Sequence, residues 1–378
     1  MLIGLVGCPN SGKSTFFKAL TLIPVEIASY PFTTIKPNQG IGYVTAKCPC
    51  KELGVKCNPK NSKCINGIRF IPVKLMDVAG LVPDAHLGKG LGNQFLDDLM
   101  QASGLIHILD CSGRTNPEGK PEKTDPKEII KVLEREIDEW IKGIIKRNLE
   151  KVRKKAEIRK IPIEKALAEQ LSGLGIKEED IKEARKKADL ESEEFASILR
   201  KISKPILIAA NKIDLPEAQE NYEKIKNENV IPCSAEMELA LKLAEKSGLI
   251  KYIPGSSNFE ILRDLPENQK NALDKIKLIL EKYGSTGVQK CLNKIVFEVL
   301  NQIVVYPVEN ENKFSDKKGN VLPDAYLLPK DSKARDLAYK IHTDFGDKFI
   351  TAINCKTKMN IGNSELKDGD IIKIVAGK

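Results

Sequence analysis

Residues near the N-terminus have the types and spacing that bind nucleoside triphosphates. The segment Gly7-Cys8-Pro9-Asn10-Ser11-Gly12-Lys13-Ser14 satisfies the pattern G-x-x-x-x-G-K-S/T. Glycines here let backbone N–H groups turn toward the phosphates, so that Lys13 can reach the β- and γ-phosphates and Ser14 can offer a hydroxyl to Mg²⁺. The predicted phosphate-binding residues are Gly7, Asn10, Ser11, Gly12, Lys13, Ser14 and Thr15. The alternative is a glycine-rich turn that merely precedes a helix.

Two further segments could complete a magnesium site. Asp77 follows the apolar run 71–76 and begins the sequence Asp77-Val78-Ala79-Gly80. A carboxylate at the end of a strand can hold Mg²⁺ through water, and the N–H of Gly80 can face the γ-phosphate. In the segment Tyr30-Pro31-Phe32-Thr33-Thr34, Thr34 would close on Mg²⁺ and the γ-phosphate, with Thr33 as the alternative and a plain surface turn as the competing explanation. We predict Ser14, Thr34 and Asp77 as the residues that hold Mg²⁺.

A third pair of segments has the chemistry to recognise guanine. Asn211-Lys212-Ile213-Asp214 follows the apolar run 206–210. Guanine presents its N1–H and N2 amine side by side, and a carboxylate accepts both, whereas adenine would place a lone pair against Asp214. The segment Cys233-Ser234-Ala235 has the form of a loop that gives a backbone N–H to guanine O6. The predicted base-binding residues are Asn211, Lys212, Asp214, Ser234 and Ala235.

A parallel sheet covered by helices would position these motifs. Strand-like runs at 2–6, 71–76, 105–109 and 205–210 alternate with helical patterns such as 13–20. The fold class predicted is therefore α/β, a P-loop nucleotide-binding domain. Residues 119–203 are rich in Lys and Glu with helical spacing, which favours an inserted helical hairpin or small helical domain.

The C-terminal part has a different texture. Short strands are expected at 303–305, 325–328, 349–353 and 371–375, around one helix at 332–342 whose N-cap would be Asp331-Ser332. These patterns predict a small α+β module. The expected domains are 1–118 with 204–265 for nucleotide binding, 119–203 for the helical insertion, 266–302 for a helical connector, and 303–378 for the C-terminal module.

Composition limits the classes of protein that remain. The 378 residues suit two or three domains, and the net charge of +9 fits either a polyanion-binding surface or a heavily charged, heat-adapted one. A single Trp gives no sign of an aromatic platform for single-stranded nucleic acid. The N-terminal residues are expected to form a buried strand and not a signal peptide, and no apolar run reaches the about 20 residues needed to span a bilayer. We expect a cytoplasmic monomer that does not bind membranes and keeps its nine cysteines reduced.

Together these segments resemble the Obg class of translation-factor GTPases, near its YchF-like branch. The likeness is carried by the P-loop, by Tyr30-Pro31-Phe32-Thr33-Thr34 followed by Pro37-Asn38, and by the segment from Asp77 to His86 followed by Gly88-Lys89-Gly90-Leu91-Gly92-Asn93. The tail resembles a TGS domain, a ubiquitin-like β-grasp module. YchF proteins resemble N-x-x-E at the base-reading motif and prefer ATP, whereas Asp214 points to a GTP-using relative of an archaeal or eukaryote-like branch.

The resemblance also bears on hydrolysis. Ras-like enzymes carry a water-positioning Gln directly after D-x-x-G, where this chain has Leu81, so slow turnover stimulated by a partner is expected. In related GTPases an Asn at the place of Asn10 helps to hold K⁺ near the phosphates; the alternative is that Asn10 only caps the loop. His86 could position water or be a structural His. The residues predicted to act in hydrolysis are Lys13, Thr34, Gly80 and Asn10.

A cysteine cluster lies in a basic insertion. Cys48, Cys50, Cys57 and Cys64 could bind Zn²⁺, although C-x-C spacing is less typical than C-x₂-C, and disulfides or free thiols are the alternatives. The basic residues around them would also suit RNA phosphates. The other five cysteines are expected to pack as small hydrophobes: Cys8, Cys111, Cys233, Cys291 and Cys355.

Two functions from different classes remain. The first is a slow GTPase switch that binds GTP and GDP with Mg²⁺ and associates with ribosomes or structured RNA. The second is an RNA-binding scaffold that uses GTP as a conformational ligand with negligible hydrolysis. An ATPase is disfavoured by Asp214.

Overall fold

A computed structural model describes residues 1–22, 38–78 and 99–377 of the chain. These residues divide into two compact units, each of which is described by itself. The first contains residues 1–22, 38–41, 74–78 and 99–291, and the second contains residues 42–73 and 292–377.

The main sheet confirms the predicted α/β class. Its strand order is β2-β4-β1-β5-β6-β7, with the short β3 paired to β4. The pairs β1–β4, β1–β5, β5–β6 and β6–β7 are all parallel. The strands are β1 (Leu2–Val6), β2 (Gln39–Lys47), β3 (Lys63–Ile65), β4 (Ile68–Asp77), β5 (Gly104–Asp110), β6 (Ile206–Asn211) and β7 (Val230–Pro232). In β5 every residue is buried, as expected for a central strand covered on both faces.

The helices of the first unit follow apolar spacing in the sequence. Helix α1 (Lys13–Thr21) buries Phe16, Ala19 and Leu20, and α8 (Ala235–Lys246) contacts it. Further elements of this unit are α7 (Pro216–Ile225), the hairpin β8 (Ile250–Lys251) and β9 (Glu260–Ile261), and α9 (Glu267–Tyr283). Helix α10 (Val288–Lys294) follows α9 after a turn at Gly284 and continues as a π-helix over Ile295–Val299.

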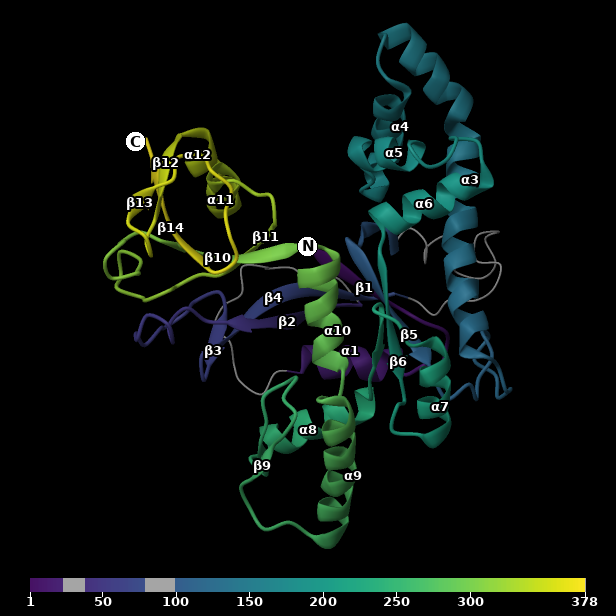
Figure 1. Cartoon of the computed structure of the whole chain (residues 1–378), viewed down its shortest axis with the longest axis vertical. Coiled ribbons are helices and arrows are strands. Elements are labelled where there is room, and N and C mark those ends of the chain that lie inside the picture. Colours follow the sequence, from purple (N-terminus) through teal and green to yellow (C-terminus); the bar gives the residue numbers. More distant parts are fainter. Residues whose placement is uncertain (23–37, 79–98, 378) are drawn as a thin grey trace. The chain divides into compact units, whose positions relative to one another are not determined.

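Residues 126–203 form four helices, which fits the small helical domain of the two predicted forms and not the hairpin. They are α3 (Pro126–Arg159), α4 (Ile163–Leu171), α5 (Glu178–Arg185) and α6 (Glu193–Ser203). The N-cap Asp125 accepts a hydrogen bond from the N–H of Lys127, and Pro126 occupies the first turn, where it needs no donor. The beginning of α3 lies beside α7, and α4 and α6 pack along its further length (Figure 1). Their shared core includes Leu133, Ile137, Trp140, Leu167 and Phe195.

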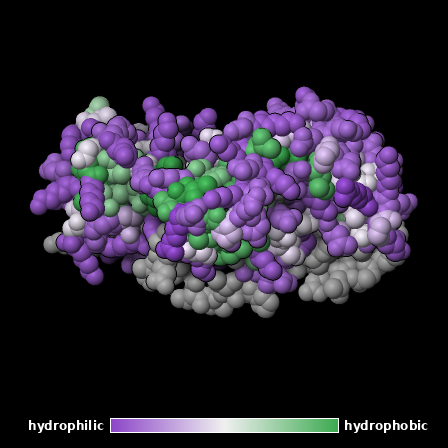
Figure 2. Space-filling view, turned by 90° about the horizontal axis from the view of Figure 1, so that it is seen from below, coloured by the Kyte–Doolittle hydropathy of each residue, from purple (hydrophilic) through white to green (hydrophobic). Residues whose placement is uncertain are grey.

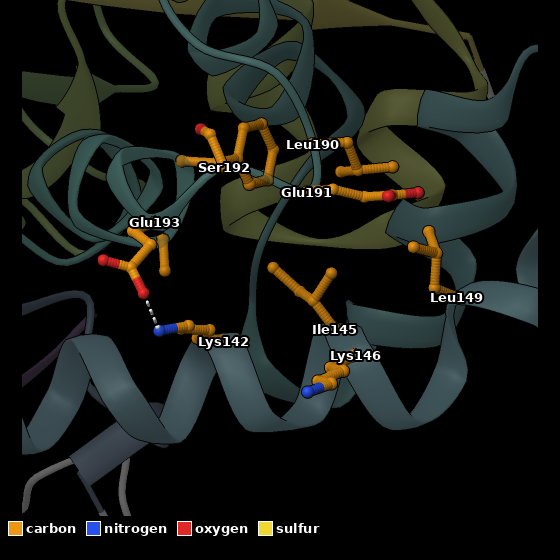
Figure 3. Close-up of a pocket in the computed structure, with 10 residues that line it drawn as sticks. Lys142, Ile145, Lys146, Leu149, Leu190, Glu191, Ser192 and Glu193 are labelled. Carbon is orange, nitrogen blue, oxygen red and sulfur yellow. Dashed lines mark hydrogen bonds and ion pairs between the residues drawn. The ribbon is translucent and has the colours of Figure 1, made fainter.

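A cavity of about 260 Å³ opens between α3 and the start of α6. Its floor is apolar, with Ile145 and Leu149 from α3 facing Leu190 (Figure 3). At its rim the ammonium of Lys142 lies 3.1 Å from a carboxylate oxygen of Glu193. The cavity is far from the predicted nucleotide motifs in sequence and contains none of them.

The second unit contains a five-stranded sheet in the order β11-β10-β14-β12-β13. Strands β10 (Gln302–Val308) and β14 (Asp370–Ala376) are parallel, while β11 (Tyr326–Pro329), β12 (Phe349–Asn354) and β13 (Met359–Asn360) join antiparallel. Helix α11 (Ala334–Ile341) packs Ala334 and Leu337 onto this sheet, and the short α12 (Thr343–Asp347) follows it. This arrangement is the predicted β-grasp module.

One local prediction in this module is wrong. The N-cap of α11 is Lys333, not Asp331-Ser332. The carboxylate of Asp336 accepts the backbone N–H of Lys333 at 2.7 Å, so the third helical residue caps the helix from inside. The capping acceptor therefore comes from Asp336 within the first turn, and not from a residue before the helix as predicted.

Hydrophilic residues predominate on the face shown in Figure 2, and hydrophobic residues gather there in smaller patches. In the first unit, the large hydrophobic side chains that stay exposed belong to the N-terminus, α3, α8, the segment at β9, and α9: Met1, Ile158, Leu243, Ile261, Leu262 and Leu278. Within the described ranges, no helix combines the length and the apolar character needed to cross a membrane.

The five cysteines outside the cluster are buried, as predicted. Burial raises the pKa of the Cys8 thiol to about 11. Burial, followed by the charge of Asp110, raises the pKa of Cys111 to about 12. These thiols therefore stay protonated at neutral pH and pack as small apolar groups.

His107 in β5 makes the stability of the first unit depend on pH. Its ring is 1% exposed, and neither ring nitrogen has a hydrogen-bond partner in the described structure. Burial lowers its pKa from 6.5 to about 4. Between these pH values the imidazole is protonated in the unfolded chain but neutral in the folded chain. The free energy of unfolding therefore falls as pH drops from 6.5 toward 4.

We expect His107→Leu to remove this part of the acid sensitivity. Between about pH 7.5 and about pH 5, wild type should lose about 2 kcal/mol more unfolding free energy than the variant, at about 1.36 kcal/mol per pKa unit. Urea unfolding followed by the fluorescence of Trp140, the single Trp, measures this difference. Equal losses in the two proteins would contradict the assignment.

Candidate nucleotide-binding site

The carboxyl ends of neighbouring parallel strands bring the predicted motifs to one edge of the sheet. Leu5 in β1 pairs with Asp77 at the end of β4, and Asp110 at the end of β5 pairs with Asn211 at the end of β6. Ligands of open α/β sheets bind in the crevice outside this edge. The loop from Gly7 to Gly12 follows β1 here and leads into α1.

The backbone of the loop requires glycine at two places. Gly12 has φ +92° at the N-cap of α1, and a Cβ at this position would lie 2.3 Å from Nδ2 of Asn211. A Cβ at Gly7 would lie 2.5 Å from the carbonyl oxygen of Ile108. Any side chain at either position would displace the loop from the strand ends.

The residues predicted to bind the phosphates and Mg²⁺ lie at the start of α1 and at the end of β4. Lys13 forms an ion pair with Asp77, and their side chains are 13% and 22% exposed. Ser14 is the next residue of the helix and is exposed. A hydroxyl and a carboxylate are the hard oxygen donors that Mg²⁺ prefers, so the donor set fits the ion.

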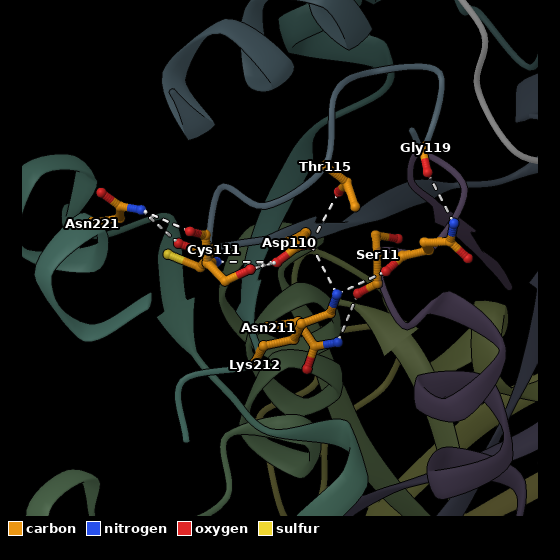
Figure 4. A network of polar contacts seen from close by, with 10 residues as sticks. Ser11, Asp110, Cys111, Thr115, Gly119, Asn211, Lys212 and Asn221 are labelled. Atoms are coloured by element: carbon orange, nitrogen blue, oxygen red, sulfur yellow. Dashed lines mark hydrogen bonds and ion pairs between the residues drawn. The ribbon is translucent and has the colours of Figure 1, made fainter. Parts of the chain in front are cut away.

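Asn211 connects the phosphate loop to the base-reading segments. Its amide nitrogen donates to the carbonyl of Ser11 at 2.8 Å, and its amide oxygen accepts the N–H of Ala235 at 3.0 Å. The side chain is buried, so each bond is shielded from water. Figure 4 shows the first of the two, between Asn211 and Ser11. The hydroxyl of Ser234 caps α8 by accepting the N–H of Met237 at 3.3 Å.

Asp110 is a site residue that the sequence analysis missed. Its carboxylate lies 2.8 Å from the ammonium of Lys212, which also donates to the carbonyl of Asn10 at 2.9 Å (Figure 4). Burial opposes ionisation of Asp110, but hydrogen bonds from Lys212, Ser112 and Thr115 together hold its pKa below the usual value. The available signal was a carboxylate directly after a buried strand, the same signal that identified Asp77.

A pocket of about 200 Å³ lies between these segments. Its lining contains seven predicted residues, together with Leu215 and Glu236, which were not predicted; the seven are Gly12, Thr15, Asn211, Lys212, Asp214, Ser234 and Ala235. The carboxylate of Asp214 forms no hydrogen bond or ion pair with another residue that the structure describes, so both oxygens can accept from a ligand.

One buried hydroxyl also points to a ligand. Ser11 is 2% exposed, and its Oγ has no hydrogen-bond partner within the described chain. A buried hydroxyl without a partner is costly, and a phosphate oxygen beside the loop would satisfy it. The glycine cradle, Ser11 and Asp214 therefore fit a nucleotide that runs from the loop to the pocket.

A buried network supports the helix behind the pocket. Glu238 of α8 accepts from the hydroxyls of Tyr252 at 2.8 Å and Thr286 at 2.5 Å, while the backbone N–H of Ser234 donates to the carbonyl of Thr286 at 2.9 Å. Lys242 donates to the carbonyl of Ala19 at the end of α1 at 2.6 Å. Sequence reasoning missed this network because Glu238 and Lys242 look like ordinary surface residues of an amphipathic helix, while Tyr252 and Thr286 lie outside that helix, farther along the chain.

Several predicted residues cannot be placed. Thr34, its alternative Thr33, Gly80, Leu81 and His86 lie outside the described residues. Asn10 is described, and its amide nitrogen donates to the carbonyl of Gly119 at 3.0 Å.

Known proteins share these features. A family model described as an Obg-like GTPase, YGR210-like, G4 motif-containing domain matches residues 209–310. A model of a 50S ribosome-binding GTPase matches residues 2–155, and a TGS domain model matches residues 315–376. A GTP-binding protein of Methanocaldococcus jannaschii is 57% identical, with 99% of each chain covered. The chain belongs to the Obg-like, YchF-related family of GTP-binding proteins.

Two further comparisons extend over the whole of this Obg-like protein. The crystal structure of a GTP-binding protein from Pyrococcus horikoshii OT3 is 42% identical, covers 100% of both chains and has a TM-score of 0.78. A ribosome-binding ATPase YchF of Buchnera aphidicola is 27% identical over 98% of each chain. The P-loop domain and the TGS domain predicted from the sequence are thus both confirmed.

Proposed function

We propose that this Obg-like protein binds GTP with Mg²⁺ and hydrolyses it slowly to GDP and phosphate. In this proposal it acts as a monomeric molecular switch on the ribosome, in the cytoplasm. The observation that carries the proposal is the pocket in which Asp214 is available beside Asn211, whose side chain is bonded to the P-loop.

Guanine recognition rests on Asp214. Its two oxygens would accept the N1–H and N2 amine of guanine, and the backbone at Ser234 and Ala235 would face O6. Adenine would bring a lone pair to the same carboxylate and leave a buried acceptor unpaired, which is how a polar site rejects a near-isostere. The family name alone does not decide the base, since YchF relatives are named ATPases.

Hydrolysis would depend on positioning and charge. Bound Mg²⁺ would be held by Ser14, Asp77 and Thr34 and would neutralise charge that develops on the phosphates. Lys13 would exchange its ion pair with Asp77 for phosphate oxygens, and Gly80 would donate its N–H to the γ-phosphate. Leu81 cannot orient a water molecule, which accounts for the slow turnover that we propose.

Asn10 would supply a ligand for K⁺. Because its amide nitrogen is bonded to Gly119, its amide oxygen is the atom left to coordinate a cation. Amide and carbonyl oxygens are the ligands that select K⁺ in other sites. A cation at this position would act on the transition state as a fixed positive charge.

Ribosome association is supported by the names of relatives. YchF of Buchnera aphidicola is named a ribosome-binding ATPase, and the family model that matches the first part of the chain is named for 50S ribosome binding. The net charge of +9 is compatible with a surface that contacts RNA phosphates.

Single-turnover hydrolysis of GTP tests the enzymatic part. Turnover should rise about tenfold or more when K⁺ replaces Na⁺ at equal ionic strength, because a fixed cation stabilises developing charge. Asn10→Ala should bind GTP more weakly than wild type, because alanine is strained at the φ of +65° found here and the bond to Gly119 is lost. Its residual turnover should no longer respond to K⁺. Added ribosomes should accelerate wild type further. No loss of GTP under any of these conditions would reject the GTPase and leave the RNA-binding scaffold.

A further inference from the structure

Four cysteine sulfurs converge in the second unit. The Sγ atoms of Cys48, Cys50, Cys57 and Cys64 all lie within 4.8 Å of one another. Cys48 and Cys57 are 3.9 Å apart at Sγ, and Cys50 and Cys64 are 3.8 Å apart. A tetrahedron of thiolates around Zn²⁺, with Zn–S bonds of about 2.3 Å, has edges of about 3.8 Å. A disulfide would need about 2.05 Å, and all four cysteines are free.

The four cysteines come from three separate segments of the fold. Cys48 and Cys50 follow the end of β2, where the N–H of Cys48 donates to the carbonyl of Gly67 at 2.8 Å. Cys64 lies in β3, and Cys57 lies in the loop between these strands. Cys48 and Cys50 are buried and the other two are partly buried. Four thiolates would fill the tetrahedral coordination of Zn²⁺ and leave no position for a substrate.

The insertion that carries the cysteines has almost no core of its own. From residue 51 to residue 68, Ser62 is the single buried residue. Apolar burial in so polar a segment is too small to offset the conformational entropy that is lost on folding. Small domains of this kind fold around a metal.

A buried charge beside the cluster needs a counter-charge. Arg69 is 0% exposed, and its guanidinium donates to Sγ of Cys48 at 3.4 Å, to Oγ of Ser62 and to the carbonyl of Leu322. No carboxylate forms an ion pair with Arg69 in the part of the chain that the structure describes. Four thiolates around one Zn²⁺ carry a net charge of minus two, which would compensate the guanidinium.

The loop between Cys57 and Cys64 lies against residues 320–325 of the C-terminal module. The N–H of Asn58 donates to the carbonyl of Val321 at 3.1 Å, and the N–H of Lys60 donates to the carbonyl of Pro323 at 2.7 Å. The amide of Asn61 bonds both the N–H and the carbonyl of Ala325, at 3.0 and 3.2 Å. This loop contacts the C-terminal module through hydrogen bonds and buries no apolar side chain against it. Its position therefore depends on how firmly its two ends, Cys57 and Cys64, are fixed.

We propose that Cys48, Cys50, Cys57 and Cys64 bind one structural Zn²⁺, and that this ion fixes residues 58–61 against residues 320–325. On binding, four S–H groups release their protons to solvent as four Zn–S bonds form, with no change of oxidation state. Cys57 and Cys64 flank the pairing loop, so the metal sets both of its ends. The site is structural, and it is independent of the nucleotide.

Metal analysis of the full chain, purified without added zinc, tests the site. We expect one zinc ion per chain by mass spectrometry. Exchange for Co²⁺ should give the intense visible bands of a tetrahedral cobalt thiolate. A wild-type chain that holds no zinc and gives no such bands with Co²⁺ overturns the proposal, and so does iron in place of zinc.

A matched pair of variants tests the ligands. Cys57→Ser should lose zinc on dialysis against a chelator, whereas Cys355→Ala should keep it, because Cys355 is a buried cysteine of the same unit outside the cluster. Equal zinc retention by both variants rejects Cys57 as a ligand.

Hydrogen exchange of the wild-type chain tests the link to the C-terminal module even if the variant does not fold. Removing zinc with a chelator should abolish protection at the amides of Lys60, Val321 and Ala325. The amide of Ala235, which bonds Asn211 in the first unit, should keep its protection and serves as the control. Unchanged protection at the first three amides after zinc removal rejects the proposed role.

Discussion

Asp214→Asn is expected to change the preferred base of this protein from guanine to xanthine. The asparagine oxygen can still accept the N1–H of either base. Its amide NH₂, however, would face the N2 amine of guanine, donor against donor. Xanthine carries a carbonyl oxygen at that position, and the asparagine amide would donate to it.

The expected size of the change follows from the bonds exchanged. Each hydrogen bond to the Asp214 carboxylate contributes about 1.5–3 kcal/mol, and a buried mismatch adds a similar cost. The variant should therefore bind GTP about 100-fold more weakly or worse, at about 1.4 kcal/mol per tenfold, and should prefer xanthosine triphosphate. Calorimetric titration of both proteins with GTP, ATP and xanthosine triphosphate in Mg²⁺ measures the change.

Asp274→Asn provides the matched control, because Asp274 is exposed on α9 of the same unit and lines no part of the pocket. It should keep the preference of wild type for GTP. A wild type that binds ATP more tightly than GTP would reject the base assignment and place this chain with the ATP-using relatives. An Asp214→Asn variant that still prefers GTP would show that another group reads the base.

The sequence was sufficient to predict an element where the local residue pattern favours the same conformation as the tertiary structure. The strand at residues 2–6 was predicted with the bounds that the structure has, because a short apolar run before a glycine turn has few other conformations. The motif residues 211–214 were predicted to follow a strand, and they lie at the carboxyl edge of the sheet because neighbouring parallel strands end there. Four of the five C-terminal strands were predicted as short apolar runs, and the two-residue β13 (Met359–Asn360) was not.

The parts that were not predicted depend on contacts between residues far apart in the chain. Lys212 contacts Asp110 and Asn10 across 102 and 202 positions. The place of Asp110 after a buried strand marks it as a candidate, but it does not reveal that Lys212 is its partner. Strands β2 and β3 were not predicted because the segment around them is rich in Lys, Asn and Cys. Their strand conformation is stabilised by pairing with neighbouring strands more than by the propensity of their residues.

Sequence order also hides which segments pack together. Residues 42–73 belong to the same compact unit as residues 292–377, although the chain between them builds most of the other unit. The link between Asn58 or Asn61 and residues 320–325 has no signature in either segment alone. The predicted domain boundaries at 119, 204, 266 and 303 stay predictions.

Lys13→Met should cause the largest loss of triphosphate affinity. Lys13 lies at the start of α1, where it can donate two charge-assisted hydrogen bonds to phosphate oxygens, at about 1.5–3 kcal/mol each. We expect GTP to bind at least about 100-fold more weakly to the variant, while guanosine, which has no phosphate, should bind equally to both proteins. Titration with GTP, GDP and guanosine measures the series. Lys18→Met, at an exposed position of the same helix, is the control and should bind like wild type.

The ion pair between Lys13 and Asp77 leads to a second prediction, in which Asp77→Asn has opposite effects on GTP binding without and with Mg²⁺. To reach a phosphate, Lys13 must leave Asp77, whose carboxylate also repels the triphosphate. Without Mg²⁺, Asp77→Asn should therefore strengthen GTP binding, because it removes both the competitor and the repulsion. With Mg²⁺, the same variant should weaken GTP binding, because it loses a group that holds the metal. A variant that shifts affinity in the same direction under both conditions would show that Asp77 does not exchange Lys13 for Mg²⁺, and the arrangement proposed for the phosphate end would have to be abandoned.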